Sequence, residues 1–229
     1  MIKILVVGSS YIGALVGGWN VVRESYQDIC LDFVGAPGQG MRGADVINGM
    51  ITGTGLKARC TEHIEQYDAF VVFGDLPSPR NIYRYYIGAS NYSSAVKAQA
   101  LADLVENSLD MYIVRELIQP FSKAPIVVVS RPENRSATLA LSHGQYVEAT
   151  NFLCSILTGD GMFYLAPPRS TLDENFEPVA EYYDGAVDVE GKTADEQELA
   201  ALGHFNIRGG IAVIEELSTT LRRVLYMAS

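Results

Sequence analysis

The chain has 229 residues, 48% of them hydrophobic, and 17 basic against 27 acidic residues give it a formal net charge of −10. This length and apolar content suffice for a full core within one α/β domain, so we expect a single domain over residues 1–229. Because the charge is strongly negative and no lysine or arginine cluster interrupts it, neither nucleic acid nor an anionic membrane surface is an expected partner.

Cysteine usage and hydropathy favour the cytoplasm. Cys30, Cys60 and Cys154 are odd in number and widely spaced, which is typical of reduced thiols and not of a disulfide framework or a zinc site. The apolar start of the chain is short, contains Lys3 and lacks a cleavage-like site, so it does not resemble a signal peptide. No run of 18 apolar residues predicts a membrane-spanning helix.

Strands and helices alternate from the N-terminus. Ile2–Val7 predicts a buried strand that ends at Gly8-Ser9-Ser10, and a helix follows to about Glu24, although Gly17 and Gly18 weaken it. A serine at such a junction lies at the carboxyl edge of a sheet, beside the unpaired N–H groups of a helix N-terminus. The same junction is also suited to binding a phosphate.

The next segments carry a second and a third strand. Ile29–Val34 predicts a strand that ends in the loop Gly35–Gly40, where three glycines and a proline force turns. Met41–Asn48 has helical potential, and Leu56–Cys60 predicts a weak strand. The clearest interior strand is Ala69–Phe73, which is followed by Gly74-Asp75.

The second half continues the alternation. Ser93–Gln119 predicts one long helix or two abutting helices before a strand at Ile126–Val129. A further helix at about Gly144–Leu157 precedes a short strand at Met162–Leu165. A polar loop then runs from Pro167 to about Asp195, and residues 203–210 open a final helix.

This order predicts a three-layer α/β/α fold with a parallel sheet of about five strands, and it places any site at the carboxyl ends of the strands. The candidates at that edge are Ser9, Ser10, the loop Gly35–Gly40, Asp75, Ser130 and Arg131.

Nucleotide motifs are incomplete, so we expect no cofactor and no metal. Gly8 and Gly13 have the outer spacing of a P-loop, but Ala14-Leu15 stands where Lys and Ser or Thr should follow. A nucleotide-binding Rossmann-like protein is therefore the weakest of three alternatives.

Four features in order resemble the GDSL/SGNH hydrolase superfamily. They are Gly8-Ser9-Ser10 after the first strand, the glycine-bearing loop after the second, the Gly74 turn after the third, and His204-Phe205-Asn206 with Gly210 before the last helix. The resemblance implies a flavodoxin-like SGNH hydrolase fold. It also implies Ser10 as nucleophile, His204 as general base and the Gly38 N–H as an oxyanion donor, with Gly35 or Gly40 as alternatives for that glycine.

The chain departs from the family pattern at two positions. The third block normally reads Gly-x-Asn-Asp, whereas here Gly74 is followed by Asp75, and the nearest asparagine is Asn81. An aspartate normally stands three residues before the histidine, whereas here that position is Ala201. The nearby upstream acids are Asp195, Glu196 and Glu198. A backbone carbonyl near residue 201 is an alternative acceptor for the histidine.

Each candidate also has a plainer interpretation. Ser10 fits a helix N-cap, His204 a helix-start histidine, and Gly38 and Asp75 ordinary turn residues. The tyrosines Tyr83, Tyr85 and Tyr86 fit a pocket wall or a contact between copies of the chain equally well, which leaves a homo-oligomer open.

The leading hypothesis is a serine hydrolase of the esterase or deacetylase type that acts on a small-molecule or carbohydrate ester. In it Ser10 attacks, His204 moves the proton, and the N–H groups of Ser10 and Gly38 bind the oxyanion. The alternative is a non-catalytic protein of the same fold, which binds a ligand after losing the orienting Asp and the oxyanion Asn.

Overall fold

A computed structural model describes residues 1–58, 62–88, 91–133, 140–159, 161–186 and 203–228. A six-stranded sheet has the order β5-β2-β1-β6-β7-β8, and β3 and β4 form a separate hairpin. The strands are β1 (Ile2–Gly8), β2 (Ile29–Gly35), β3 (Asp45–Ile47), β4 (Met50–Thr52), β5 (Lys57–Ala58), β6 (Ala69–Phe73), β7 (Ile126–Val129) and β8 (Met162–Leu165).

Five strands of the main sheet are parallel, and only the edge strand β5 is antiparallel to its neighbour β2. Numbered along the chain, the five parallel strands have the order 2-1-3-4-5, which is the flavodoxin-like doubly wound arrangement. The predicted three-layer α/β fold with about five parallel strands is therefore confirmed.

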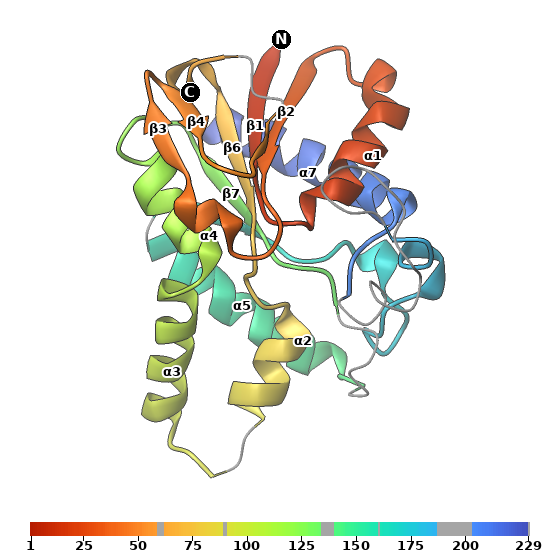
Figure 1. Ribbon diagram of the computed structural model, residues 1–229. Helices are drawn as coiled ribbons and strands as arrows, with labels where there is room; N and C mark the ends of the chain where they lie inside the picture. Colours follow the sequence, from red (N-terminus) through yellow and green to blue (C-terminus); the bar gives the residue numbers. More distant parts are fainter. Residues whose placement is uncertain (59–61, 89–90, 134–139, 160, 187–202, 229) are drawn as a thin grey trace.

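Helices cover both faces of this sheet. Figure 1 shows α1 and α7 on one side, and α4 and α5 on the other. The α-helices are α1 (Ile12–Val22), α2 (Pro79–Ile82), α3 (Ser94–Glu106), α4 (Leu109–Tyr112), α5 (His143–Gly159) and α7 (Ile207–Ala228). Two π-helical segments, η4 (Tyr83–Ile87) and η5 (Ile113–Ile118), continue α2 and α4. Short 3-10 turns lie at Arg23–Ser25, Gly40–Gly43, Ile64–Gln66, Arg169–Thr171 and Ala180–Tyr182.

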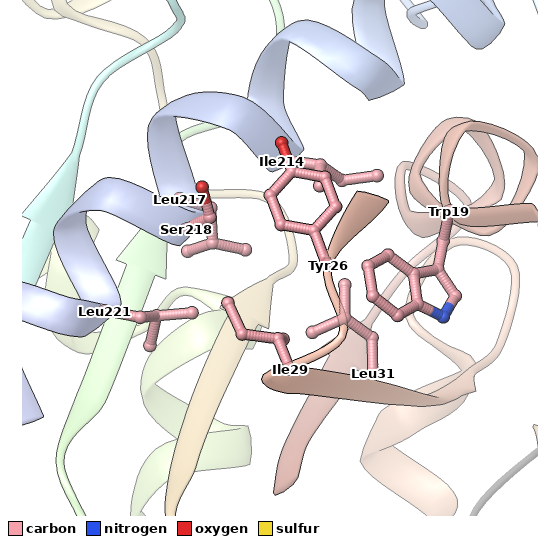
Figure 2. Close-up of a pocket in the computed structure, with 8 residues that line it drawn as sticks. All are labelled: Trp19, Tyr26, Ile29, Leu31, Ile214, Leu217, Ser218 and Leu221. Carbon is pink, nitrogen blue, oxygen red and sulfur yellow. The ribbon is translucent and has the colours of Figure 1, made fainter. Parts of the chain in front are cut away.

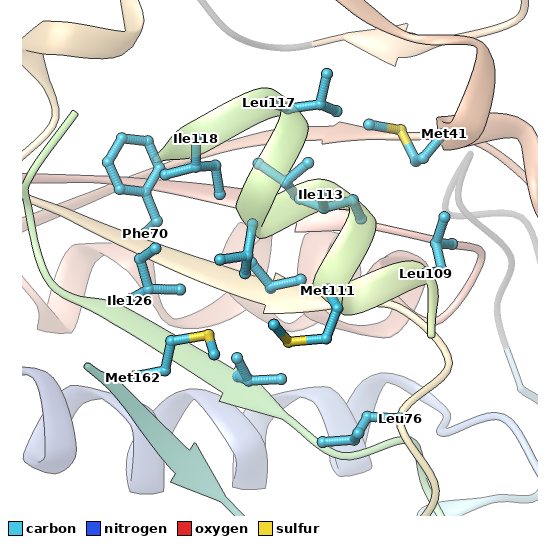
Figure 3. Packing of buried hydrophobic residues seen from close by; sticks show 14 of the residues in the cluster. Met41, Phe70, Leu76, Leu109, Met111, Ile113, Leu117, Ile118, Ile126 and Met162 are labelled. Atoms are coloured by element: carbon cyan, nitrogen blue, oxygen red, sulfur yellow. The ribbon is translucent and has the colours of Figure 1, made fainter. Parts of the chain in front are cut away.

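Alternate residues of each strand enter different cores, as the period of a β-strand requires. Ile4 and Val6 of β1 pack with α1 and α7, whereas Leu5 and Val7 belong to the core under η5 and α5. Figure 3 shows Ile118 of η5 beside Phe70 of β6, and both belong to this core. The middle of the sheet is thus buried on both faces.

A small gap remains between α1, β2 and α7. Its volume is about 10 Å³, and its lining is mostly apolar (Figure 2). That volume is about the space of one water molecule, so the gap is too small to bind a substrate. None of the described helices is both long enough and apolar enough to span a bilayer.

The helical expectation for Met41–Asn48 is wrong. After a 3-10 turn at Gly40–Gly43, the chain forms the β3–β4 hairpin. Asn48 and Gly49 connect its strands with φ of 52° and 76°. An Asn-Gly pair with positive φ at both positions is the preferred two-residue hairpin loop, so this dipeptide was the overlooked signal.

The segment Ser93–Gln119 contains two successive helices, α3 and α4, and not one long helix. This is the second of the two arrangements predicted for it. Helix α3 ends at Glu106, and the Ser108 hydroxyl then caps α4 by accepting from the Met111 N–H at 3.2 Å. The short helix α2 was not predicted. Ser78 is its N-cap and Pro79 its first residue, which is a common way to start a helix.

Helices α1 and α7 cross with their backbones in contact, because glycines stand at the crossing. A Cβ on Gly210 would lie 1.9 Å from the Ala14 carbonyl oxygen, and one on Gly18 would lie 2.8 Å from the Ile211 nitrogen. The glycines that weaken α1 as a helix thus allow α7 to approach it. This contact brings the starts of the two helices together.

We expect Gly210→Ala to lower the free energy of unfolding by roughly 1–3 kcal/mol, because the new methyl group forces the two backbones apart. Urea unfolding measures the change. Gly144→Ala is the control, since a Cβ at that helical position meets nothing within 4 Å and should be neutral or slightly stabilising. Equal stability of the two variants would show that the crossing does not need glycine.

Candidate active site

Ser10 and His204 meet at the carboxyl edge of the sheet. The Ser10 Oγ lies 2.8 Å from the His204 Nε2, although the two residues are 194 positions apart in the chain. Ser10 lies two residues after the end of β1, and His204 lies three residues before α7. Since these helices cross at glycines, their N-terminal segments hold the two side chains within hydrogen-bond distance.

The hydroxyl of Ser10 is not used as a helix cap. Helix α1 begins at Ile12, its N-cap residue is Tyr11, and no side chain caps it by a hydrogen bond. Ser9, the residue before Ser10, has a structural role: its Oγ donates to the Gly74 carbonyl at 2.8 Å. The side chain of Ser10 is therefore available to His204.

The imidazole of His204 is 4% exposed and lies in an aromatic stack. Its ring centroid is 4.6 Å from that of Tyr11, which in turn stacks on Phe73 at 5.8 Å. Sequence reasoning missed Tyr11, although its place directly after Ser10 was a signal. The stack restricts tilting of the imidazole plane, and the hydrogen bond to Ser10 involves its Nε2.

Asn206 anchors the backbone beside His204. Its side-chain Oδ1 accepts from the Gly209 N–H at 3.0 Å, and its Nδ2 donates to the carbonyls of Glu181 and Asp184 at 2.8 and 2.7 Å. Asn206 thus caps α7 and ties the helix start to a neighbouring turn. This explains why an asparagine follows the histidine so closely.

A cavity of about 370 Å³ opens at the Ser10–His204 pair. It brings together four of the predicted site residues, Ser10, His204, Gly38 and Asp75, whereas Asn81 is buried in α2 and is absent from the lining. The residues that line it are Ser9, Ser10, Tyr11, Pro37, Gly38, Gln39, Asp75 and His204.

The turn after β6 is held by a buried acid that the sequence analysis did not single out. Asp110 of α4 accepts three backbone hydrogen bonds, from Gly74 at 2.8 Å and from Asp75 and Leu76 at 2.7 Å each. Burial raises the pKa of Asp110 to about 7, while the N–H donors favour its ionised form. These three N–H groups are engaged, so they do not face the cavity as oxyanion donors.

The side chain of Asp75 accepts two hydrogen bonds in the turn after β6. Its Oδ1 accepts from the Leu109 N–H at 2.7 Å, and its Oδ2 accepts from the Gln39 Nε2 at 2.8 Å. Asp75 therefore connects the turn after β6 with α4 and with the loop after β2.

Neither Ser10 nor Gly38 donates its backbone N–H to another described residue, so both N–H groups remain as candidate oxyanion donors.

The last strands contribute less to the cavity. Ser130 is buried, and the Arg131 N–H donates to the Leu76 carbonyl at 2.9 Å. The positive charge of Arg131 acts on the Tyr11 phenol. Burial raises the pKa of Tyr11, and this positive charge opposes the shift. The upstream candidates Ala201, Asp195, Glu196 and Glu198 lie outside the described residues.

A second buried acid, Glu133, follows β7. Its carboxylate accepts from the Ser78 hydroxyl at 2.6 Å and from the Arg80 N–H at 3.3 Å. Burial raises its pKa to about 7, against these hydrogen bonds and the nearby positive charge of Arg80. Glu133 thereby connects the start of α2 with the segment that follows β7. The described part of the chain contains no cluster of three or more His, Cys, Asp or Glu residues suited to a metal ion.

No protein-family model and no curated protein matches the chain. Among solved structures, a lipase from a goat rumen metagenome is similar with a TM-score of 0.44 and 8% identity, over 96% of this chain and 97% of that one. A DUF4886 family protein from Bacteroides uniformis has a TM-score of 0.36 and 11% identity, over 78% and 76%. A variant of an acetyl-xylooligosaccharide esterase from Geobacillus has 0.33 and 12%, over 98% and 94%. These likenesses concern the chain trace and assign no activity to this protein.

We expect Asp110→Asn to lower the free energy of unfolding by about 1–3 kcal/mol. In the wild type, both carboxylate oxygens accept from backbone N–H groups, whereas in the variant the asparagine amide nitrogen would replace one of these acceptors. Chemical denaturation measures the loss. Asp103→Asn on the exposed face of α3 is the matched control and should change little. A loss no larger than that of the control would show that the turn does not depend on Asp110.

The raised pKa values predict a pH dependence of stability. Asp110 and Glu133 titrate near 7 in the folded chain, against ordinary values of 3.8 and 4.5, so the folded state binds more protons between these limits. The free energy of unfolding should therefore fall as the pH rises from about 4.5 to 7 and level off above it. Urea unfolding of the wild type and of Glu133→Gln tests this, because the variant should show a shallower fall. The exposed Glu148→Gln is the control, and an unchanged slope in Glu133→Gln would contradict the assignment.

Proposed function

We propose that the protein is an SGNH-type serine hydrolase that cleaves an ester, with Ser10 as nucleophile and His204 as general base. The observation that carries the proposal is the hydrogen bond of 2.8 Å between the Ser10 Oγ and the His204 Nε2, at the mouth of a cavity. A nucleophile and a base in direct contact, with the base fixed by its surroundings, is the arrangement that activates a serine.

In the proposed reaction, His204 Nε2 takes the hydroxyl proton while Ser10 Oγ forms a bond to the carbonyl carbon of the ester. The N–H groups of Ser10 and Gly38 stabilise the oxyanion, and the N-terminus of α1 adds a favourable dipole. The oxyanion then collapses, the bond to the alcohol oxygen breaks, and His204 returns the proton to the departing alcohol. Water repeats the sequence on the acyl-enzyme and releases the acid.

The cavity favours a small ester. Its volume of about 370 Å³ lies near the lower end of the range for small-molecule sites. Tyr11 and Pro37 give it an apolar wall. We therefore propose a small-molecule or carbohydrate ester with a short acyl group as the substrate class.

A ligand-binding protein without catalysis is the second candidate, and one observation favours it. The turn after β6 supplies no oxyanion donor, since its three N–H groups bind Asp110 and the Asp75 side chain is an acceptor. Loss of one oxyanion donor lowers turnover by about 10²–10³-fold, which weakens a hydrolase without abolishing it. Ester hydrolysis therefore remains the better supported function.

A fluorophosphonate probe tests the two candidates. The wild type should form a covalent adduct on Ser10 and hydrolyse p-nitrophenyl acetate, because the probe reports a nucleophilic serine with a neighbouring base. Ser10→Ala should abolish both, and His204→Gln should reduce both by at least about 10³-fold.

Two variants serve as controls. Ser155→Ala removes an exposed hydroxyl of α5, and His143→Gln removes an exposed histidine at the start of that helix, so both should react like the wild type. Ligand binding with no adduct on Ser10 would favour the non-catalytic protein. Wild-type hydrolysis by Ser10→Ala would end the proposal.

A further inference from the structure

The loop that carries Gly38 is held by hydrogen bonds and not by packing. Ala36 and Met41 are buried at its two ends, whereas residues 37–40 between them are exposed. Gly38 has a φ of +54°, and a Cβ there would meet nothing within 4 Å. Any fixed position of the Gly38 N–H therefore depends on polar contacts of this loop.

Two of those contacts are backbone hydrogen bonds, from the Gly40 N–H to the Pro37 carbonyl at 3.0 Å and from the Arg42 N–H to the Gln39 carbonyl at 2.9 Å. The contacts that tie the loop to the rest of the protein form a chain of three side chains. Arg42 Nε donates to Gln39 Oε1 at 2.8 Å, and Gln39 Nε2 donates to Asp75 Oδ2 at 2.8 Å. The chain is anchored at both ends. Arg42 Nη2 donates to the Asn107 carbonyl at 2.7 Å, and Asp75 Oδ1 accepts from the Leu109 N–H at 2.7 Å.

The polarity of this chain is fixed by its ends. A guanidinium has only donors and an ionised carboxylate only acceptors, so the Gln39 amide has one orientation that satisfies both neighbours. An asparagine at position 75 has one acceptor oxygen for two donors, so its amide nitrogen would face either the Gln39 N–H or the Leu109 N–H. The two donors that meet Asp75, Gln39 and Leu109, are therefore matched by a carboxylate and not by an amide.

We propose that Arg42, Gln39 and Asp75 act as a positioning relay that sets the place of the Gly38 N–H in the oxyanion hole. The inference rests on the proposed function. Asp75 links the loop to the turn after β6, and that turn is joined to the Ser10 segment through the bond from Ser9 Oγ to the Gly74 carbonyl. The relay thus fixes the distance between the two backbone donors that remain for an oxyanion.

Gln39→Met tests the relay, since it keeps the length of the side chain and removes both hydrogen bonds. We expect kcat for p-nitrophenyl acetate and the rate of fluorophosphonate labelling to fall about 10- to 100-fold, because a displaced donor stabilises the transition state less. KM and the melting temperature should stay near wild-type values. Gln99→Met is the matched control, because Gln99 Nε2 also donates to a carboxylate, Asp103, at 2.8 Å on the exposed face of α3. Its kcat should equal that of the wild type.

A polarity exchange provides a rescue. Gln39→Glu alone sets two carboxylates against each other, and Asp75→Asn alone sets two N–H donors against each other. The double variant lets Asn at 75 donate to Glu at 39, which still accepts from Arg42. We expect each single variant to lose kcat and the double variant to recover at least about tenfold over the worse single one.

The outcomes separate this inference from the proposed function. The relay would be overturned, and the proposed hydrolase retained, if the wild type is labelled but kcat is unchanged in Gln39→Met. The same holds if the wild type is labelled but the losses of the two single variants add up in the double variant. Failure of the wild type to label or hydrolyse would overturn the hydrolase, and the relay with it. A fall in the melting temperature that accounts for the lost kcat would also overturn the relay, because the role would then be structural.

Discussion

The carboxylate of Asp110 is the constraint on which the candidate site depends. One buried side chain accepts three successive N–H groups of the turn after β6, at 2.7 to 2.8 Å, and thereby fixes the backbone of Gly74, Asp75 and Leu76. Gly74 tolerates no side chain there, since a Cβ would lie 2.7 Å from Asp110 Oδ2. Three hydrogen bonds to one ionisable group in a buried site give that turn a single conformation.

The neighbouring turns depend on this one. The Gly74 carbonyl accepts a hydrogen bond from the Ser9 hydroxyl in the turn after β1. The Asp75 carboxylate accepts one from the Gln39 amide in the loop after β2. Three strand ends are therefore tied together by polar contacts at the edge of the sheet. The fourth contributor arrives from the other end of the chain, where the glycine crossing of α1 and α7 and the Asn206 cap bring His204 to Ser10.

The fold was readable from the sequence because its signals are local. Ile2–Val7 and Ala69–Phe73 are apolar runs that end at glycines, and such runs alternate with helical periods, which is enough for a parallel sheet. The helix predicted for Met41–Asn48 does not form, because the Asn48-Gly49 turn overrides the helical composition of this segment.

The site was only partly readable, for a different reason. Ser10 and His204 could be paired from the family resemblance, and the structure places them together. Asp110 and Gln39 carry no local pattern: an aspartate at a helix start is common, and its three partners lie some 35 positions away in the chain. Long-range hydrogen bonds of this kind leave no periodicity, so they appear only once the chain is folded.

The charge arrangement bears on how such a site would work. A free carboxylate beside a developing oxyanion opposes it, by about 4 kcal/mol at 4 Å for an effective dielectric constant of 20. Asp75 is not free, because both of its oxygens accept hydrogen bonds and the chain through Gln39 ends on the positive charge of Arg42. The stabilisation of an oxyanion would then rest on main-chain N–H groups and the N-terminus of α1, neither of which is a side-chain donor. A motif search for a donor side chain does not detect such a site. The proposed chemistry needs only that the backbone N–H groups of Ser10 and Gly38 keep their positions.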